Sequence, residues 1–448
     1  MSTSRPNGKP MKLTQDAMGF GLRVLNRFAG LPLVDRLGLR KTSEKIIFGA
    51  SKNAFRSAGA VGRSFSAVQK LVKPARLPRN NGMDLFDITP SDEQQMLRDS
   101  AHGFAMEQLR PAAQAADTAC AAPADLLKQS ADLGITLMSV PEELGGASAE
   151  RSAMTNVLVT EAMAQGDMGL AVACLAPAAV STALVLWGNE NQQAAYLPAF
   201  VGENIPAAAL AVQEPYALFN PFQLKTRAVA AEGGYILNGV KSLVPRAAEA
   251  ELFIIAAELE GRGPALFVIE SKTKGLSVEA EPAMGLRAAA TARVILNQVK
   301  LPAAALLGEA SAENYAECIH LSQLGWCSVA LGTAQAALDY VVPYVNDRVA
   351  FGEPISHRQS VAFTVANMGI ELEGMRLLTY RAAGRAEQGK SFFRETALAR
   401  RLCADKGMQI GNDSVQLLGG HGFVKEHPVE RWYRDLRAVG LMEGVLLV

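Results

Sequence analysis

The feature that most constrains the fold is a change of hydrophobic periodicity in the middle of the chain. Residues 84–208 place apolar residues at helical spacing, and helical spacing returns in residues 309–448. Between them, residues 209–308 hold short runs rich in β-branched and aromatic residues, such as YILNG, ELFIIAAEL and PALFVIE. Gly, Pro or Asn separate these runs, which is typical of antiparallel strands. The order predicts an α+β fold with a middle antiparallel β domain between an N-terminal helical domain and a C-terminal helical bundle.

Length and composition agree with several domains in one intracellular chain. A sequence of 448 residues is too long for one small core. Its five cysteines are scattered without a C-x-x-C pair, which favours reduced thiols over a disulfide framework. The five histidines lack metal-ligand spacing, so we predict no metal site. A dinucleotide-binding G-x-G-x-x-G motif and a P-loop are also missing from the sequence, which disfavours a Rossmann or P-loop nucleotide site.

Residues 1–83 form a basic N-terminal extension. Sixteen of the 44 Lys and Arg fall within residues 1–80, against only three acidic residues there, Asp16, Asp35 and Glu44. Apolar residues at helical spacing alternate with these cations, which favours peripheral contact with an anionic membrane surface. Packing on the protein's own body or on a partner subunit is an equal alternative, and an organellar transit peptide is a third.

The same extension bears on partners and location. Aromatic residues are not interleaved with the basic ones, so we do not expect nucleic acid as a partner. The N-terminus lacks a compact apolar run with a small-residue cleavage site, so we expect no secretory signal. These features predict a cytoplasmic protein peripheral to the inner membrane, or alternatively one of the mitochondrial matrix.

One stretch, from Met168 to Gly188, is uncharged and long enough to cross a bilayer. It is, however, mostly Ala with Pro177, Ser181 and Thr182, and it is poor in Leu and Ile. A buried helix of a globular protein is therefore the better prediction.

Four short motifs follow one another in the last third of the chain. The motif R-x-x-F-G-x-P-I with a downstream Gln consists of Arg348, Phe351, Gly352, Pro354, Ile355 and Gln359. The motif Q-x-x-G-G-x-G-F consists of Gln416, Gly419, Gly420, Gly422 and Phe423, and the pairs Arg434-Asp435 and Glu443-Gly444 come after it. With these motifs and the more diffuse VPEELGGAS and GNENQQAAYLPAF runs, residues 84–448 resemble the acyl-CoA dehydrogenase family of flavoenzymes.

The resemblance implies a bound FAD between the β domain and the C-terminal helices, in a homodimer or homotetramer. It implies that the neighbouring subunit reaches the pyrophosphate and adenine of that FAD, and that an electron-transfer flavoprotein accepts the electrons. The cofactor-binding residues carried over are Arg348 at a phosphate, Phe351 and Gln359 near the cofactor, Gln416, Gly419 and Gly420 at the adenylate, and Gln213 in the β domain. Gly444 is carried over as substrate-binding. From the residues alone, Arg348 could equally form a surface salt bridge with Asp347 or Glu353.

Glu443 is the predicted catalytic residue. In the resembled family, a carboxylate removes the proton alpha to the thioester while hydride passes from the beta carbon to flavin, giving trans-2-enoyl-CoA in fatty acid beta-oxidation. Leu441, Met442 and Val445 give Glu443 apolar neighbours, and burial among such residues raises the pKa of a carboxyl toward operating pH. A Glu taken at random is simply solvated, but the order R-D…E-G favours a base.

Several positions depart from the family pattern. The Thr and Ser expected near flavin in the β domain are Gln213 and Phe219, and the expected Trp and Thr are Leu243 and Pro245. An Arg that the family often carries aligns with Gln323, and only four residues follow Gly444, the first of them Val445 in place of the usual Thr. The chain is therefore a divergent branch with rebuilt flavin contacts, a fragment, or a degenerate paralogue. The predicted function is that of an FAD-dependent acyl-CoA dehydrogenase. The substitutions and the short C-terminus favour, as the alternative, a non-catalytic family member that acts as a scaffold or partner subunit. A third possibility is an oxidase with oxygen as acceptor, which the sequence does not distinguish from a dehydrogenase.

Overall fold

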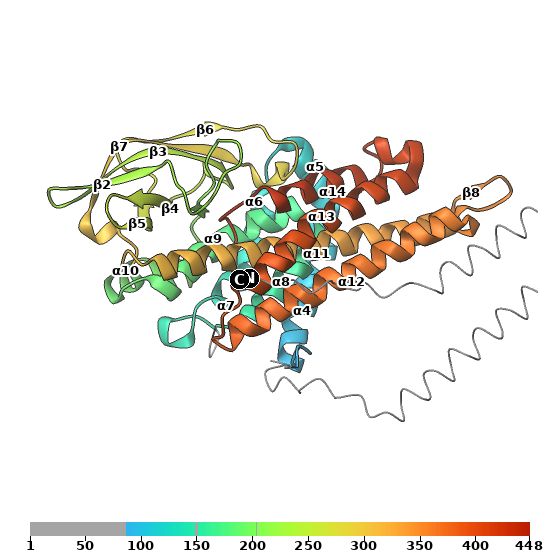
Figure 1. The fold of residues 1–448 in the computed structure, drawn as a ribbon, viewed down its shortest axis with the longest axis horizontal. Coiled ribbons are helices and arrows are strands. Elements are labelled where there is room, and N and C mark those ends of the chain that lie inside the picture. Colours follow the sequence, from blue (N-terminus) through green and yellow to red (C-terminus); the bar gives the residue numbers. More distant parts are fainter. Residues whose placement is uncertain (1–86, 148–150, 203) are drawn as a thin grey trace, which may run out of the picture. The chain divides into compact units, whose positions relative to one another are not determined.

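The computed structural model describes residues 87–147, 151–202 and 204–448. The predictions made for residues 1–83 lie outside the described residues. Within residues 87–448, helices come first, strands follow, and long helices close the chain (Figure 1). This order confirms the predicted fold class, while the proposed domain boundaries at residues 84, 209 and 309 stay predictions.

The first described part of the chain, up to Phe200, is helical. Ser91 begins the first of its helices with a capping box, because its hydroxyl accepts the N–H of Gln94 and the Gln94 side chain accepts the N–H of Ser91. The helices are α4 (Asp92–Phe104), α5 (Arg110–Ala119), α6 (Ala124–Asp132), α7 (Ile135–Met138), α8 (Ala153–Gly166), α9 (Met168–Trp187) and α10 (Glu190–Phe200).

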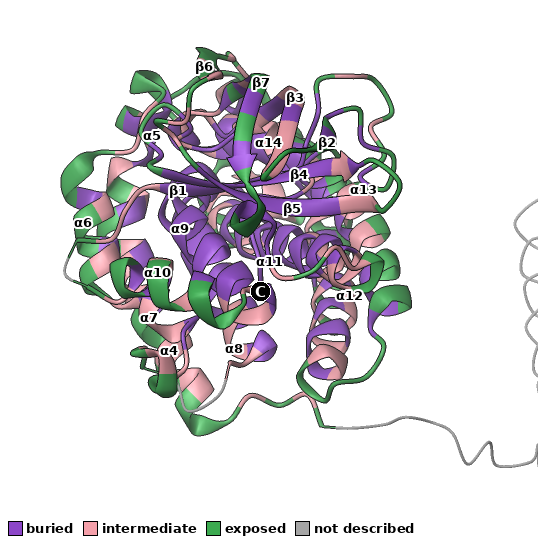
Figure 2. Cartoon of the chain, turned by 90° about the vertical axis from the view of Figure 1, so that its left-hand side faces the viewer, coloured by how far each residue is buried: buried purple, intermediate pink, exposed green. Residues whose placement is uncertain are grey.

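Helix α9 is the stretch whose length alone would allow a membrane span. Among the described residues it is the one helix long and apolar enough to cross a bilayer, yet 89% of its most apolar window is buried inside the protein. Its N-cap, Asp167, accepts the N–H of Leu170 at 3.0 Å and is itself buried. Helix α9 appears almost entirely buried beneath the sheet in Figure 2. Helix α9 is thus a core helix, as its Ala-rich composition predicts.

The middle of the chain forms one seven-stranded sheet in the order β1-β4-β2-β3-β7-β6, with β5 paired to β4. The strands are β1 (Ala208–Ala211), β2 (Arg227–Ala231), β3 (Gly234–Val244), β4 (Leu252–Leu259), β5 (Gly263–Glu270), β6 (Leu276–Ala280) and β7 (Ala292–Pro302). The predicted antiparallel pairing holds for β2–β3, β3–β7, β4–β5 and β6–β7.

The prediction of a wholly antiparallel domain needs one correction. Strand β4 pairs in parallel with β1 and with β2, so the sheet is mixed. Strands β1 and β2 lie one after the other along β4, at Leu252–Ile255 and at Glu258–Leu259. Neither strand is joined to β4 by a tight hairpin, so turn chemistry does not dictate the direction of these pairs.

Long helices complete the fold. They are α11 (Ala312–Asp347), α12 (Gln359–Glu387), α13 (Phe393–Leu418) and α14 (Val429–Leu436), with a small β8 (Val349–Ala350) and β9 (Glu353–Pro354) hairpin after α11. Helix α11 packs against α8, α12 and α13, and its N-terminal part also contacts β5. It therefore connects the helical core with the sheet.

A buried ion pair fixes the loop that follows β1. The Lys241 Nζ lies 2.8 Å from Glu214 Oε1, and neither side chain is exposed by more than 1%. Glu214 also accepts the N–H groups of Lys225 and Thr226. Burial raises the pKa of Glu214, but Lys241 and these N–H groups outweigh it and hold that pKa below its usual value. Burial lowers the pKa of Lys241 to about 8, so both groups stay charged at neutral pH.

Replacing Lys241 with Met should therefore be costly. The substitution leaves the Glu214 carboxylate buried without its cation, and losses of this kind are about 3–5 kcal/mol of unfolding free energy. Arg401→Met is the matched control, because Arg401 and Asp405 form an exposed pair at 3.0 Å that contributes about 0.3–0.5 kcal/mol. Urea denaturation of both variants measures the difference, and equal losses would contradict a structural role for the buried pair.

Candidate functional site

The strongest candidate site lies where the chain returns to the sheet after α14. A short 3₁₀ turn (Arg437–Gly440) leads to Glu443, and Gly444 then forms an antiparallel bridge with Ala211 at the end of β1. The next residue, Val445, donates its N–H to the carbonyl of Leu210 at 3.2 Å. The residues around Glu443 are therefore held by backbone hydrogen bonds to the sheet.

Helix α11 holds the same segment from the other side. Ser322 donates its hydroxyl to the carbonyl of Gly444 at 2.7 Å, and Trp326 donates its indole N–H to that same carbonyl at 2.9 Å. Both side chains are fully buried. Two donors on one acceptor, in a region closed to water, fix the peptide that follows Glu443.

Glycine is required at position 444. Its φ is +76°, and a Cβ there would lie 2.7 Å from Val212 Cγ2. Val445 also has a φ of +76°, which is rare for a β-branched residue. Backbone strain of this kind persists only where the surroundings enforce it, and here it lies directly beside Glu443.

The Glu443 carboxylate is largely shielded, with 12% of the side chain exposed. Arg400 Nη2 lies 3.0 Å from Oε1, and Gln323 Nε2 lies 3.3 Å from Oε1 and 3.1 Å from Oε2. Burial raises the pKa of Glu443 above its ordinary value, while Arg400 and Gln323 oppose the rise. A shielded carboxylate with a raised pKa has the properties that a general base needs.

The sheet side of the site holds the positions that depart from the family pattern. Gln213 is 5% exposed, its carbonyl accepts the N–H of Ser242 at 2.9 Å, and its Oε1 has no hydrogen-bond partner among the described residues. Leu243 has a φ of +53° and donates its N–H to Glu281 Oε2 at 2.8 Å. Pro245 is buried. Gln213 thus keeps a buried acceptor without a partner among the described residues, whereas the backbone donor of Leu243 is already engaged.

An apolar cavity of about 90 Å³ adjoins these residues. Leu243 and Leu286 line it from the β domain, and Leu441 and Met442 line it from the segment just before Glu443. A planar ring bound in this cavity would contact apolar side chains of both the β domain and the C-terminal segment.

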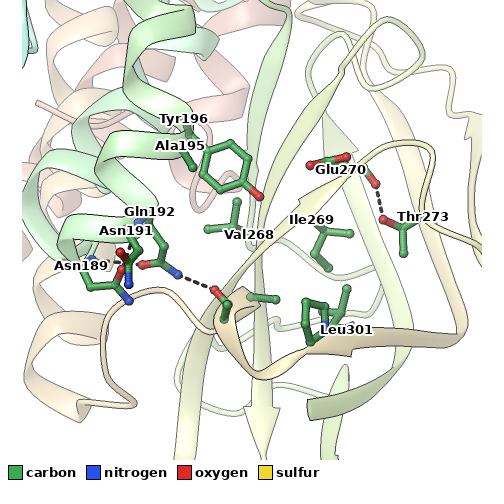
Figure 3. A pocket seen from close by; sticks show the side chains of 13 residues that line it. Asn189, Asn191, Gln192, Ala195, Tyr196, Val268, Ile269, Glu270, Thr273 and Leu301 are labelled. Carbon is green, nitrogen blue, oxygen red and sulfur yellow. Dashed lines mark hydrogen bonds between the residues drawn. The ribbon is translucent and has the colours of Figure 1, made fainter. Parts of the chain in front are cut away.

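A larger cavity of about 400 Å³ lies between α10 and the sheet, away from Glu443 (Figure 3). Figure 3 shows Tyr196 and Gln192 on one side and Glu270 and Leu301 on the other. Gln192 already donates to the carbonyls of Ala304 and Leu306 at 2.8 and 2.7 Å. This cavity brings together none of the predicted site residues, so it is not the candidate site.

The other predicted cofactor residues lie together at one end of the helical bundle. Tyr344, one turn before Arg348, is hydrogen-bonded through its hydroxyl to His421 Nδ1 at 2.9 Å, which brings the end of α11 to the Gly419–Phe423 turn. The predicted residues at this end are Arg348, Phe351, Gln359, Gln416, Gly419 and Gly420, and all six are exposed.

This second group does not meet Glu443 within one chain. From Gln323 to Arg348 the axis of α11 runs about 37 Å at the α-helical rise per residue. No single dinucleotide cofactor joins two clusters so far apart. If both clusters bind FAD, the cluster around Arg348 must contact the FAD of another copy of the chain.

The exposed cluster is shaped for an external partner. Phe351 is 96% exposed with a φ of +57°, which is unusual for an aromatic residue. Gly419 also has a φ of +57°, and a Cβ at Gly419 or Gly420 would meet no atom within 4 Å. The open space beside these glycines fits the adenylate end of a flavin dinucleotide, and the unpartnered acceptor of Gln213 and the apolar cavity near Leu243 fit its ring end.

Sequence reasoning missed the groups that hold Glu443 in place. Arg400, Ser322 and Trp326 lie far from Glu443 in the sequence and belong to no motif. A local signal existed for Ser322 only, since a hydroxyl among apolar residues of a helix needs a partner. For Arg400 the sequence offered no signal.

Comparison with known protein families matches nearly the whole described region. The acyl-CoA dehydrogenase N-terminal domain matches residues 91–204, the middle domain residues 209–299 and the C-terminal domain residues 314–446.

Individual proteins of this family are also similar to the chain over most of its length. An acyl-CoA dehydrogenase of Bacillus subtilis is 31% identical over 363 residues, covering 79% of this chain and 95% of the relative. The short-chain specific acyl-CoA dehydrogenase of human mitochondria is 32% identical, covering 78% of this chain and 86% of the relative. Butyryl-CoA dehydrogenase from Megasphaera elsdenii has a solved structure with a TM-score of 0.74 and 30% identity, covering 80% of this chain and 96% of that one.

The close approach of Gly444 to Val212 leads to a prediction. Gly444→Ala should displace the Glu443 segment, because the new Cβ meets Val212 and the φ of +76° disfavours any L side chain. We expect the variant to fold and to lose at least about 90% of its turnover, the cost of a misplaced catalytic group. Gly103→Ala is the control, since nothing lies within 4 Å of its Cβ, and it should keep full turnover. Normal turnover in Gly444→Ala would show that the position tolerates a side chain.

Proposed function

Because this chain belongs to the acyl-CoA dehydrogenase family, whose members are FAD-binding oxidoreductases acting on CH–CH bonds, we propose that it oxidises a fatty acyl-CoA thioester to trans-2-enoyl-CoA. The observation that carries the proposal is the position of Glu443, a shielded carboxylate with a raised pKa. A role in fatty acid beta-oxidation follows from this reaction. The basic extension formed by residues 1–83 favours long-chain substrates that partition to a membrane.

The chemistry assigned to this chain is proton removal. Glu443 accepts the proton from the carbon alpha to the thioester carbonyl, and its shielding from water keeps the carboxylate weakly solvated and basic. FAD, when bound, accepts the hydride that leaves the beta carbon. Gly444 lets the backbone at Glu443 approach the end of β1 closely, so the carboxylate stays fixed while the substrate enters.

The residues that would hold FAD are split between two copies of the chain. Gln213 and the cavity beside Leu243 would receive the ring end. Arg348 would bind a phosphate with its planar guanidinium, and Gln416, Gly419 and Gly420 would receive the adenylate end. Phe351 and Gln359 would lie beside the cofactor.

The surface of α12 supports a homodimer or a homotetramer. Phe363, Ile370 and Leu377 are 62%, 68% and 57% exposed, and their spacing of seven residues puts them on one face of the helix. Leu398 on α13 is also exposed, at 43%. Exposed apolar side chains in such a row are typical of an interface, and this interface would bring the Arg348 cluster of one copy to the flavin of another.

Partners and location complete the proposal. An electron-transfer flavoprotein takes up the electrons, as the family resemblance implies. The basic composition of residues 1–83 supports the proposal of peripheral contact with an anionic membrane surface and of a cytoplasmic protein at the inner membrane. The mitochondrial matrix is the alternative location.

The interface leads to a prediction for Ile370. Ile370→Asp buries a carboxylate in the proposed interface, so the protein should become monomeric or bind its partner copy at least about 100-fold more weakly. Such a monomer should also lose FAD, because the Arg348 cluster can no longer reach it. Met96→Asp is the control, since Met96 on α4 is exposed to a similar extent, at 62%, outside this row. Light scattering after size-exclusion chromatography measures the mass, and an unchanged oligomer in Ile370→Asp would contradict the proposal.

Glu443→Gln tests the catalytic assignment. The amide keeps the size of the side chain but cannot accept the proton, so substrate-driven flavin reduction should slow at least about 10⁴-fold while FAD stays bound. Glu279→Gln on the exposed face of β6 should reduce its flavin at the wild-type rate. Anaerobic stopped-flow mixing with palmitoyl-CoA measures both rates. Wild-type flavin reduction in Glu443→Gln would show that another group is the base.

A further inference from the structure

The Glu443 carboxylate has a cationic partner that the assigned chemistry does not use. Arg400 on α13 places one nitrogen, Nη2, 3.0 Å from Glu443 Oε1 and 2.6 Å from the carbonyl of Met442. Its side chain is 13% exposed, close to the 12% of Glu443. One guanidinium nitrogen therefore contacts both the carboxylate and the peptide carbonyl just before it.

The position of Arg400 on α13 makes this contact rigid. Ala399 and Cys403 on the same helix are fully buried, and α13 packs along α11 and α12. The adjacent Arg401 has a different environment, since 79% of its side chain is exposed and its partner is Asp405. Of these two consecutive arginines, Arg400 thus points into the site and Arg401 faces solvent.

The other titratable groups near Glu443 are neutral. Tyr315 and Cys327 on α11 interact electrostatically with Glu443, and burial raises the pKa of both. His320 lies one turn before Gln323 on α11, and burial lowers its pKa. At neutral pH none of these three carries a charge. Gln323 of α11, which donates to both Glu443 oxygens, is uncharged as well, and so are Leu210, Ala211 and Val212, the sheet residues in backbone contact with the Gly444–Val445 segment.

We propose that Arg400 is a positioning residue that fixes the Glu443 carboxylate beside Gly444 and keeps it ionised, ready to accept the α proton. Its bond to the Met442 carbonyl sets where the segment lies, and its bond to Oε1 sets where the carboxylate points. The part of this inference that concerns proton removal rests on the proposed function. The ion pair itself rests only on the geometry.

The direction of the expected effect follows from the environment of Glu443. Burial raises the pKa of Glu443 and Arg400 lowers it, so a variant without the cation holds Glu443 protonated up to a higher pH. A protonated carboxyl cannot act as a base. The fall in reaction rate caused by replacing Arg400 should therefore be greatest at low pH and should become smaller as the pH rises.

The first experiment compares Arg400→Met, Arg400→Lys and the control Arg401→Met. The rate of flavin reduction by saturating palmitoyl-CoA is measured anaerobically from pH 5.5 to 9. In Arg400→Met the midpoint of the profile should move up by about one pH unit or more, so that at pH values below both midpoints the rate is about tenfold below that of Arg401→Met. Arg400→Lys should restore most of the shift, because the contact to Oε1 uses a single nitrogen. An unmoved midpoint in Arg400→Met would overturn the proposal, even if the variant were less stable.

The second experiment does not depend on activity. A thermal-unfolding cycle compares the wild type, Arg400→Met, Glu443→Gln and the double variant at pH 7.5. Each single variant leaves one member of the buried pair without its partner. The decrease in Tm of the double variant should therefore be clearly smaller than the sum of the decreases in the two single variants. If the decreases in Tm were additive, the two side chains would not interact and the proposed ion pair would be wrong. Coupling in a protein whose flavin is never reduced by acyl-CoA would support the ion pair and refute the proposed function instead.

Discussion

The return of the chain to β1 is the constraint on which the site depends. Gly444 pairs with Ala211 on the sheet, while Ser322 and Trp326 of α11 donate to its carbonyl. The segment after α14 is thereby fixed between the β domain and the longest helix, and Glu443 follows with little freedom of its own. The requirement for glycine at 444 and the unusual φ of Val445 are the local cost of this close approach.

The length of α11 separates the two groups of predicted site residues within one chain. The helix contacts the sheet near its N-terminal end and leads to Arg348 at the other, about 37 Å beyond Gln323. Gln323, which contacts Glu443, and Arg348, the predicted phosphate-binding residue, thus lie far apart along one helix. The proposed second copy would resolve this, and the exposed apolar row on α12 is the surface proposed for it. Oligomerisation and cofactor binding are, on this account, one requirement.

Much of the fold could be predicted from the sequence, and the parts that could not have physical reasons. Periodicity and the motifs predicted helices, sheet, helices and the position of Glu443, because those signals are local. The parallel pairing of β4 with β1 and β2 depends on long connections, for which no turn residue gives a signal. The contact of Arg400 with Glu443 depends on how α13 packs on α11, and a single arginine in an amphipathic helix predicts only a solvated face. The substituted positions Gln213 and Leu243 lie in the same part of the β domain as the buried Lys241–Glu214 pair, which fixes the loop after β1.

The most direct test of the central claim is the visible absorption spectrum of the purified protein, recorded without oxygen before and after addition of palmitoyl-CoA. A working acyl-CoA dehydrogenase should show an oxidised flavin band that bleaches on addition. A protein that stays colourless after incubation with FAD would contradict the account and favour a non-catalytic family member that acts as a scaffold or partner subunit.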